Sequence, residues 1–154
     1  MSKLKQLKER LQKFDPNETL NKILSTAQSE QFIADLVRKR LNEKGEDSTG
    51  KKIKTYGASG SNAYAARTIV EKQIKGQVYN HVTLRDTGSF QKSFEVELKK
   101  EMFNITGDSD KENGQIEDNV DLTNVLNLSD KEKGVLANEI KPKYIQAARN
   151  IIKV

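Results

Sequence analysis

The sequence predicts an α+β fold with N-terminal helices, a small antiparallel sheet and a long C-terminal helix. Apolar residues recur at helical spacing near both ends of the 154-residue chain. Between these ends, short segments alternate apolar and polar residues, as strands with one buried face do. We therefore expect an N-terminal helical segment over residues 1–44, a Gly/Ser-rich arm over 45–63, and an α+β core with a C-terminal helix over 64–154.

A first amphipathic helix is expected at the N-terminus. Its apolar residues recur every three or four positions, at Leu4, Leu7, Leu11 and Phe14. This spacing places them on one face of a helix of about three turns, for which Ser2 is a candidate N-cap. The helix is expected to stop at Asp15-Pro16, because proline disfavours a helical conformation in the residue before it.

A second helix is expected to begin at Asp15-Pro16. Asp15 is a suitable N-cap, and Pro16 loses no hydrogen bond at the first helical position because the N–H there has no partner inside the helix. The apolar stripe continues to Lys44, and Gly45 is a suitable C-terminal stop. Polar residues dilute the middle of this stripe, so we expect a kink near Ser29.

Residues 45–62 are rich in Gly, Ser and Thr and predict a long loop. Loops of this length are usually functional or disordered. We interpret the segment either as an extended arm that reaches a neighbouring subunit or as a plain surface loop. Gly57 and Gly60 do not form a phosphate-binding loop, because the Gly-x-x-x-x-Gly-Lys-Ser/Thr pattern is absent. The next segment, from Tyr64 to Lys75, is either a short helix or an extended stretch.

Three strands are expected in the second half of the chain. Alternating apolar and polar residues indicate strands over Gln77–Leu84, Phe94–Leu98 and Met102–Thr106. A short turn at residues 99–101 joins the last two strands, and the polar stretch from 107 to 119 predicts a turn. Together the strands suggest a small antiparallel sheet with one buried and one charged face.

The final helix is expected to open at a capping box. Ser129 and Glu132 have the Ser-x-x-Glu spacing in which each side chain accepts a hydrogen bond from the other residue's backbone N–H. Apolar residues then follow at near-helical spacing to the C-terminus. Pro142 should kink or restart this helix, because proline has no N–H to donate and crowds the preceding turn.

Composition indicates a lean core and excludes several chemistries. Apolar residues make up 34% and charged residues 32% of the chain, so the protein either carries long exposed helices or completes its core against other subunits. The absence of Cys excludes disulfides, thiolate catalysis and Cys-type zinc sites. No apolar run approaches the roughly 20 residues that cross a bilayer, and no apolar signal core follows the charged N-terminus. We expect a cytoplasmic origin and no membrane partner.

Charge is distributed unevenly along the chain, whose net charge is +5. Residues 107–121 contain six acidic residues and one basic residue, Lys111. Residues 1–13 have one acidic residue and the basic residues Lys3, Lys5, Lys8, Arg10 and Lys13. The basic segment of one copy could meet the acidic segment of another copy, or a different acidic partner. The alternative is two solvated faces, since exposed ion pairs contribute little.

The stretch Val82–Phe94 is the most informative part of the sequence. It contains a Gly-bearing corner with the candidate site residues Arg85, Asp86, Thr87, Gly88, Phe90, Ser93 and Phe94. Asp86 or Thr87 can cap a short helical turn, and Gly88 allows close approach to other backbone. Phe90 and Phe94 then share one face of the turn and dock on the sheet. We interpret this corner as architectural.

The corner also resembles a known family. Tailed-bacteriophage neck and tail-completion proteins, in particular those of crAss-like phages, share a Thr-Gly-x-[Leu/Phe]-x-x-Ser-[Ile/Phe] core. The matching residues are Thr87, Gly88, Phe90, Ser93 and Phe94. A looser resemblance extends over residues 77–154 and includes the strand pair and the terminal helix. Residues 1–44 have no counterpart in this pattern, and the acidic segment 107–121 is unlike the compact hairpin of smaller relatives.

The resemblance implies a structural virion protein without catalytic activity or cofactor. Such a protein would form a homo-oligomeric ring of six or twelve copies at the portal vertex. The ring would join the portal to the neck and tail proteins, and would be assembled in the host cytoplasm. A lean core, a long Gly/Ser-rich arm and segregated charges suit a subunit that its neighbours complete.

Other functions find less support in the sequence. His81 is the single imidazole and lies in a predicted strand, where a satisfied or exposed histidine is expected. The run Asp108-x-Asp110-x-Glu112-x-Gly114 is similar to a calcium loop, but its Gly falls one place late and Asn119 stands where the bidentate Glu is required. We therefore predict no metal site and no enzyme.

Non-specific DNA binding is the main alternative. The five basic residues of the first helix could track phosphates. The arm adds Lys51, Lys52 and Lys54. No helix-turn-helix, zinc finger or aromatic stacking motif indicates sequence-specific recognition. In a ring around a channel, the same residues would face packaged DNA.

Overall fold

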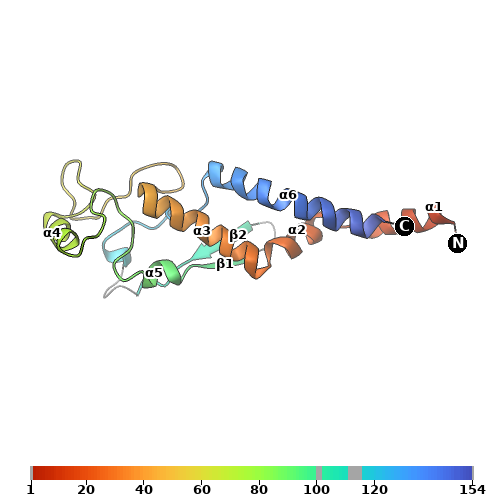
Figure 1. Cartoon of the computed structure of the whole chain (residues 1–154), viewed down its shortest axis with the longest axis horizontal. Helices are drawn as coiled ribbons and strands as arrows, with labels where there is room; N and C mark the ends of the chain where they lie inside the picture. Colours follow the sequence, from red (N-terminus) through yellow and green to blue (C-terminus); the bar gives the residue numbers. More distant parts are fainter. Residues whose placement is uncertain (1, 100–101, 111–115, 154) are drawn as a thin grey trace.

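The computed structural model describes residues 2–99, 102–110 and 116–153 and has the shape of an elongated rod (Figure 1). The first helix, α1 (Lys3–Lys13), lies at one end of the rod beside the C-terminal end of the last helix, α6 (Asp130–Ile152). A short helix, α4 (Ala66–Ile74), lies at the opposite end. The predicted α+β class is confirmed.

The N-terminal part contains three helices where the sequence predicts two. Ser2 caps α1 as expected, accepting a hydrogen bond from the Lys5 N–H. The Asp15 carboxylate caps α2 (Pro16–Leu24), with Pro16 at its first position.

The chain breaks after Leu24, four residues before the predicted kink. Thr26 caps a new helix, α3 (Ala27–Lys44), by accepting from the Ser29 N–H. Ser29 is therefore in the first turn of α3 and donates its own hydroxyl to the Ile23 carbonyl at 2.8 Å. This local side-chain bonding replaces the kinked helix with two capped helices. Gly45 ends α3 in the left-handed conformation, with φ +60°.

The predicted capping box opens α6. The Ser129 hydroxyl accepts from the Glu132 N–H, and the Glu132 carboxylate accepts from the Ser129 N–H at 2.8 Å. The helix continues through Pro142 without a restart. The carbonyl of Asn138, four residues earlier, loses its helical partner, but Asn138 and Pro142 are both exposed and water can satisfy that carbonyl.

The sheet consists of one antiparallel hairpin, and the expected strand over 77–84 is wrong. Strand β1 (Glu95–Lys99) pairs with β2 (Met102–Thr106), with Glu95 opposite Thr106. Residues 77–84 instead form an irregular segment. Val82, Thr83 and Leu84 are all buried in succession, so the segment has no solvent-facing side there, and Leu84 adopts a positive φ of 52° that ends any extended run.

The remaining elements are short. Helix α4 resolves the ambiguity over Tyr64–Lys75 in favour of a helix. Helix α5 (Ser89–Lys92) lies within the corner. A 3₁₀ turn, η1 (Ile116–Asp118), lies within the acidic segment 107–121. No helix in the described part of the chain is both long and apolar enough to cross a membrane.

The core lies at the junction of α3, the corner, β2 and the N-terminal half of α6. Its most deeply buried side chains are Ile33, Val37, Leu41, Val82, Phe90 and Val125. The loop over 45–63 folds back on this core. Ile53 is buried, its N–H donates to the Gly45 carbonyl, and the Tyr56 N–H donates to the Asn119 carbonyl. Within a single chain, the middle of the loop is therefore anchored to the rest of the fold.

Candidate interaction surfaces

The corner is packed around its two aromatic rings. Phe90 and Phe94 meet edge to face, with ring centroids 5.2 Å apart, and both are buried. Gly107, just after β2, lies against them: a Cβ there would come within 2.8 Å of the Phe90 ring. Arg38 stacks over the outer side of Phe94 at 5.5 Å. The rings thus join α5, α3 and the end of the hairpin.

Polar groups of the corner hold its backbone. Gly88 precedes α5 with φ +88°, a conformation that a Cβ would strain. Contrary to the expected close backbone contact, the site of its missing Cβ is 3.8 Å from the nearest atom, in the Arg85 side chain. The Thr87 hydroxyl accepts from the Ser89 N–H at 3.3 Å. Ser93 donates to the Phe90 carbonyl at 2.7 Å and accepts from the Asp108 N–H at 2.8 Å.

The start of the corner is bound to α4. Asp86 accepts from the Lys75 ammonium at 2.8 Å and from the Gln77 amide at 3.2 Å. The hydrogen bond from Lys75 holds the pKa of the Asp86 carboxyl below its ordinary value, against a smaller opposing effect of burial. The Arg85 carbonyl accepts from the buried Lys72 ammonium at 3.1 Å. The Arg85 backbone therefore has the structural role here, and its side chain is exposed.

Sequence reasoning missed the residue that locks the corner to α3. Gln91 is buried and donates to the Thr83 carbonyl at 2.7 Å and to the Asn42 amide oxygen at 3.0 Å. Its own carbonyl accepts from Arg38 at 2.7 Å. Gln91 lies between the motif positions Phe90 and Ser93. The local sequence contains no signal that its side chain is buried.

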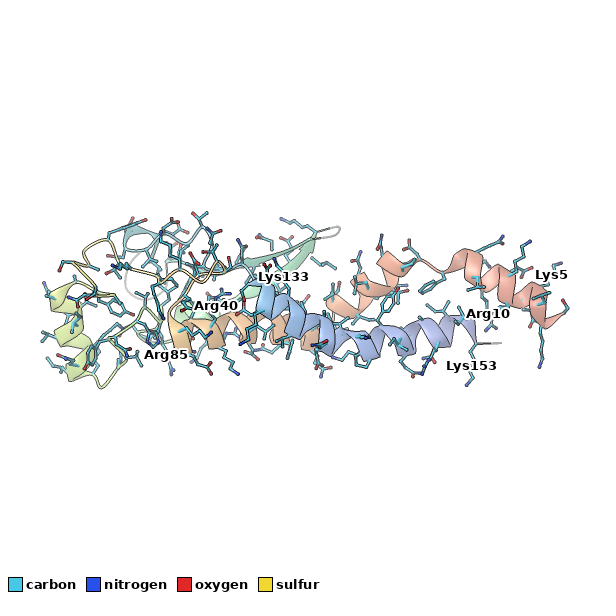
Figure 2. All side chains as sticks on the ribbon, turned by 90° about the horizontal axis from the view of Figure 1, so that it is seen from above. Lys5, Arg10, Arg40, Arg85, Lys133 and Lys153 are labelled. Atoms are coloured by element: carbon cyan, nitrogen blue, oxygen red, sulfur yellow. The ribbon has the colours of Figure 1, made fainter. Side chains whose placement is uncertain are left out.

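A buried ion pair is the second missed feature. Arg40 and Glu132 form a salt bridge whose side chains are 7% and 11% exposed. Arg40 also donates to the carbonyls of Glu46, Val125 and Asn127, so it joins α3, the loop, the 120–128 segment and the start of α6 (Figure 2). Burial lowers the pKa of Arg40 and the charge of Glu132 opposes that shift. The sequence contained a signal for this burial. Arg40 lies seven residues, or about two helical turns, after the buried Ile33, so the two residues share one face of α3.

His81 and the acidic run from Asp108 are the candidates that the sequence offers for other chemistry. His81 is satisfied, with its ring nitrogens 2.8 Å from the Asn80 amide oxygen and 2.8 Å from the Asn42 carbonyl. Among the described residues, no group of three or more His, Asp or Glu side chains could hold a metal ion. The predicted calcium-like run continues into 111–115, which lies outside those residues. Every buried polar side-chain atom in the described ranges has a partner.

The basic residues of the first helix belong to a larger feature, which we call the stalk: residues 2–14 together with 141–153. The C-terminal end of α6 lies beside α1, and the Arg10 guanidinium donates to the Lys153 carbonyl (Figure 2). The stalk carries nine basic residues and one acidic residue, a formal charge of +8. Because the whole chain carries +5, the remainder carries −3. The four bases from α6 were missed, since nothing local in the sequence pairs them with α1.

The stalk also exposes apolar side chains. None of the eleven residues of α1, all of which are described, is buried. Leu4 is 77% and Leu11 51% exposed, and together with Leu7 they border a shallow hollow on α1. On α6, Ile145 and Ile151 are also more than a third exposed. The stripe that predicts α1 therefore faces outward over much of its length.

The three loop lysines do not join the stalk. The Lys52 ammonium donates to the Lys44 carbonyl at 2.9 Å and pairs with Glu46 at 3.1 Å. The Lys54 ammonium donates to the Gly60 carbonyl at 2.8 Å, and the Lys51 backbone N–H donates to Asp47 at 3.0 Å. The predicted basic set is thus divided between two separate regions.

The opposite end of the rod carries a second apolar surface, which we call the head patch: Val70, Ile74, Val78 and Tyr79. Val70 and Ile74 are one turn apart on α4 and are 53% and 81% exposed. Val78 and Tyr79 follow the turn after α4 and are more than 40% exposed. The acidic η1 lies near this helix, because Glu71 of α4 and Ile116 of η1 line the same pocket.

An apolar groove of about 780 Å³ separates α2 from α6. Leu20 and Leu24 line one side and Ile140 and Tyr144 the other. Its lining also includes Lys133 and Lys141, and Lys141 belongs to the stalk as well.

Comparison of the chain with protein-family models, with curated proteins and with solved structures finds no match.

Proposed function

We propose that this protein is a structural subunit of a homo-oligomeric ring at the portal vertex of a tailed bacteriophage. The ring would join the portal to the neck and tail proteins, line or seal the DNA channel, and catalyse nothing. The resemblance of the corner to neck and tail-completion proteins suggests which assembly this is. The geometry supports an architectural role for that corner, because the hydroxyls of Thr87 and Ser93 bond to its own backbone.

One observation carries the oligomeric part of the proposal. The stalk is a long projection whose leucines are exposed and whose charge of +8 is opposite in sign to that of the rest of the chain. Exposed apolar surface with a strong charge asymmetry is typical of surfaces that bind another macromolecule. A stalk covered by a partner would bury the leucines and neutralise the bases.

Native mass spectrometry of the purified full chain tests the proposal, followed by electron microscopy of the same sample. We expect a closed ring of six or twelve copies at micromolar concentration. Mixing with portal or tail proteins of the same virus should then give a stacked complex. A chain that remains monomeric at every concentration and salt tested would contradict the proposal.

Non-specific DNA binding is the second candidate, favoured by the nine bases that the stalk brings together. Titration of duplex DNA over a range of salt tests it. Each phosphate neutralised on duplex DNA should steepen the salt dependence of log K by about 0.9. A monomer that binds duplex with a steep slope supports this candidate, whereas salt-independent rings that ignore DNA exclude it.

A further inference from the structure

We infer that α1 binds an anionic phospholipid surface, on which it lies in the plane of the interface with Leu4, Leu7 and Leu11 turned toward the lipid chains. The sequence predicted no membrane partner because no segment is long enough to span a bilayer. A helix that lies on the surface needs no such segment. This membrane contact goes beyond the proposed ring and concerns α1 alone, so the exposed Ile145 and Ile151 of α6 remain for contacts between copies.

The apolar stripe of α1 is uncovered in the folded chain. None of the residues of α1 is buried, and Leu4 is 77% exposed. The contact with α6 is made at the flank of the stripe, where the Arg10 guanidinium donates to the Lys153 carbonyl (Figure 2). The stripe is therefore open to a partner along most of its length.

The side chains around α1 are arranged as in helices that lie on membranes. With 3.6 residues per turn, Lys3 and Arg10 lie on one flank of the leucine stripe and Lys8 lies on the other. Glu9, the one acidic residue of this helix, lies on the opposite face. Basic residues beside an apolar stripe are typical of interfacial helices, because their long side chains reach the headgroup phosphates while the stripe enters the acyl boundary.

The head patch also exposes apolar side chains on a helix, but the basic residues beside it are already neutralised. Arg67 of α4 pairs with Glu71 at 2.9 Å, and Lys75 pairs with Asp86 at 2.8 Å. Among the described residues, by contrast, no carboxylate forms an ion pair with any of the five basic residues of α1. The charge of α1 is therefore available to an anionic partner.

The combination of free bases and exposed leucines selects a lipid surface over other partners. Duplex DNA would neutralise the bases but would leave Leu4 and Leu11 in water, because it presents phosphate and sugar to its ligands. A second stalk would cover the leucines but would bring two charges of +8 together. An anionic membrane has a negative surface with an apolar layer directly beneath it, within the depth that one helix reaches.

The distribution of charge along the rod also determines how the protein approaches the membrane. The stalk carries +8 and the remainder of the chain −3. The stalk and α4 lie at opposite ends of the rod (Figure 1). An anionic surface attracts the first and repels the remainder, so the rod binds by its stalk end and directs α4 away from the membrane.

Vesicle co-sedimentation of the full chain tests the inference, with equimolar phosphatidylglycerol and phosphatidylcholine compared with phosphatidylcholine alone. We expect binding to the anionic vesicles only, and weaker binding as the salt concentration rises. Lys3→Gln with Lys8→Gln should weaken binding about fivefold for each base removed. The matched control, Lys92→Gln with Lys131→Gln, removes two exposed lysines outside the stalk and should bind like the wild type.

The apolar stripe is tested by a separate pair of variants. Leu4→Ser with Leu11→Ser should weaken vesicle binding at least about tenfold, because two leucines no longer enter the lipid. Val70→Ser with Ile74→Ser makes a matched change of polarity on the head patch and should leave binding unchanged. These four side chains are exposed, so both variants should keep the wild-type circular dichroism spectrum and unfolding transition.

Fluorescence reports directly on insertion, because the chain contains no tryptophan of its own. The emission of Leu4→Trp should shift to shorter wavelength when anionic vesicles are added, since its indole leaves water. Ile74→Trp, on the head patch, should show no shift. Duplex DNA added in place of the vesicles should leave the emission of Leu4→Trp at its aqueous wavelength.

Four results would overturn the inference. The first is a wild type that does not bind anionic vesicles at low salt. Binding that Leu4→Ser with Leu11→Ser does not weaken would be purely electrostatic and would assign the stalk to polyanions such as DNA. Equal losses in the stripe variant and the head-patch control would show that α1 is not the site. These three results leave the proposed ring intact. The fourth is a wild-type oligomer, seen by native mass spectrometry without vesicles, that the stripe variant dissociates, because another copy would then cover the leucines.

Discussion

The corner and the stalk both derive from amphipathic sequence patterns, yet their side chains end in opposite environments. Phe90 is fully buried, and the polar groups around it bond within the chain. Leu4 and Leu11 occupy equally regular helical positions and remain mostly in water. The difference shows that an apolar stripe indicates a surface to be covered, and that it does not say whether the cover comes from the same chain.

The comparison suggests that the core and the stalk have different roles, a division that can be tested. The core, with its paired polar groups, should determine stability, and the stalk should contribute little to it. Substitutions in the stalk should instead change association. Four measurements of the free energy of unfolding can test this division, from the largest expected effect to the smallest.

Removing one partner of the buried ion pair should have the largest effect. Arg40→Met leaves Glu132 buried without its counter-ion and removes the donors to three carbonyls. Loss of one member of a buried pair costs about 3–5 kcal/mol. Urea unfolding measures the loss, with Arg10→Met in the stalk as the control, for which we expect less than about 1 kcal/mol. Equal losses in both variants would refute the division.

Truncating the buried ring should cost a comparable amount. Phe90→Ala removes the edge-to-face partner of Phe94 and leaves a cavity against Gly107. Changes of this kind cost about 3–5 kcal/mol. Leu4→Ala, at a site 77% exposed, should cost under about 0.5 kcal/mol in the same urea assay. A large loss from Leu4→Ala in the monomer would place α1 within the folding core.

Replacing either of two glycines by alanine should have a smaller effect on stability, and the two effects should have opposite signs. Gly107→Ala forces a Cβ to within 2.8 Å of the Phe90 ring and should destabilise by about 1–3 kcal/mol. Gly134 lies inside α6 with no atom within 4 Å of the added methyl, so Gly134→Ala should stabilise by about 0.5–1 kcal/mol. Thermal unfolding of the two variants reports both signs. A stabilising Gly107→Ala would mean that the corner is loosely packed.

The smallest effect concerns pH. Lys75 holds the pKa of Asp86 below its ordinary value, so the unfolded chain binds a proton more readily than the folded chain. The contribution is therefore present above about pH 4 and is lost as pH falls through the folded pKa. Asp86 is about a third exposed, so the contribution of the Lys75–Asp86 pair to the free energy of unfolding should be under about 1 kcal/mol. Asp86→Asn should flatten the acid limb of the stability curve; an unchanged limb would contradict the assignment.

Local signals predicted the ends of the elements well. Ser2, Asp15 and Ser129 cap helices as expected because a short polar side chain reaches the backbone N–H groups two or three residues ahead. The strand expected over 77–84 fails for the opposite reason. Its alternation was genuine, but Val82, Thr83 and Leu84 are all enclosed by tertiary contacts, including the Tyr64 hydroxyl bonded to the Thr83 N–H.

The interaction surfaces were only half visible before folding. The five basic residues of α1 were evident from the sequence, whereas the four of α6 join them only because the end of α6 lies beside α1 in the fold. Gln91 and Gly107 likewise gain their roles from neighbours that the local sequence does not specify.

The sequence by itself determined the α+β class, the helix caps, the hairpin and the uneven distribution of charge along the chain. These features depend on composition or on contacts within a few residues. Tertiary structure alone decided that Gln91 and Arg40 are buried, and that the basic residues at both ends of the chain share one stalk. Those outcomes depend on which side chains become neighbours in the folded chain, because tertiary neighbours determine burial and long-range electrostatics.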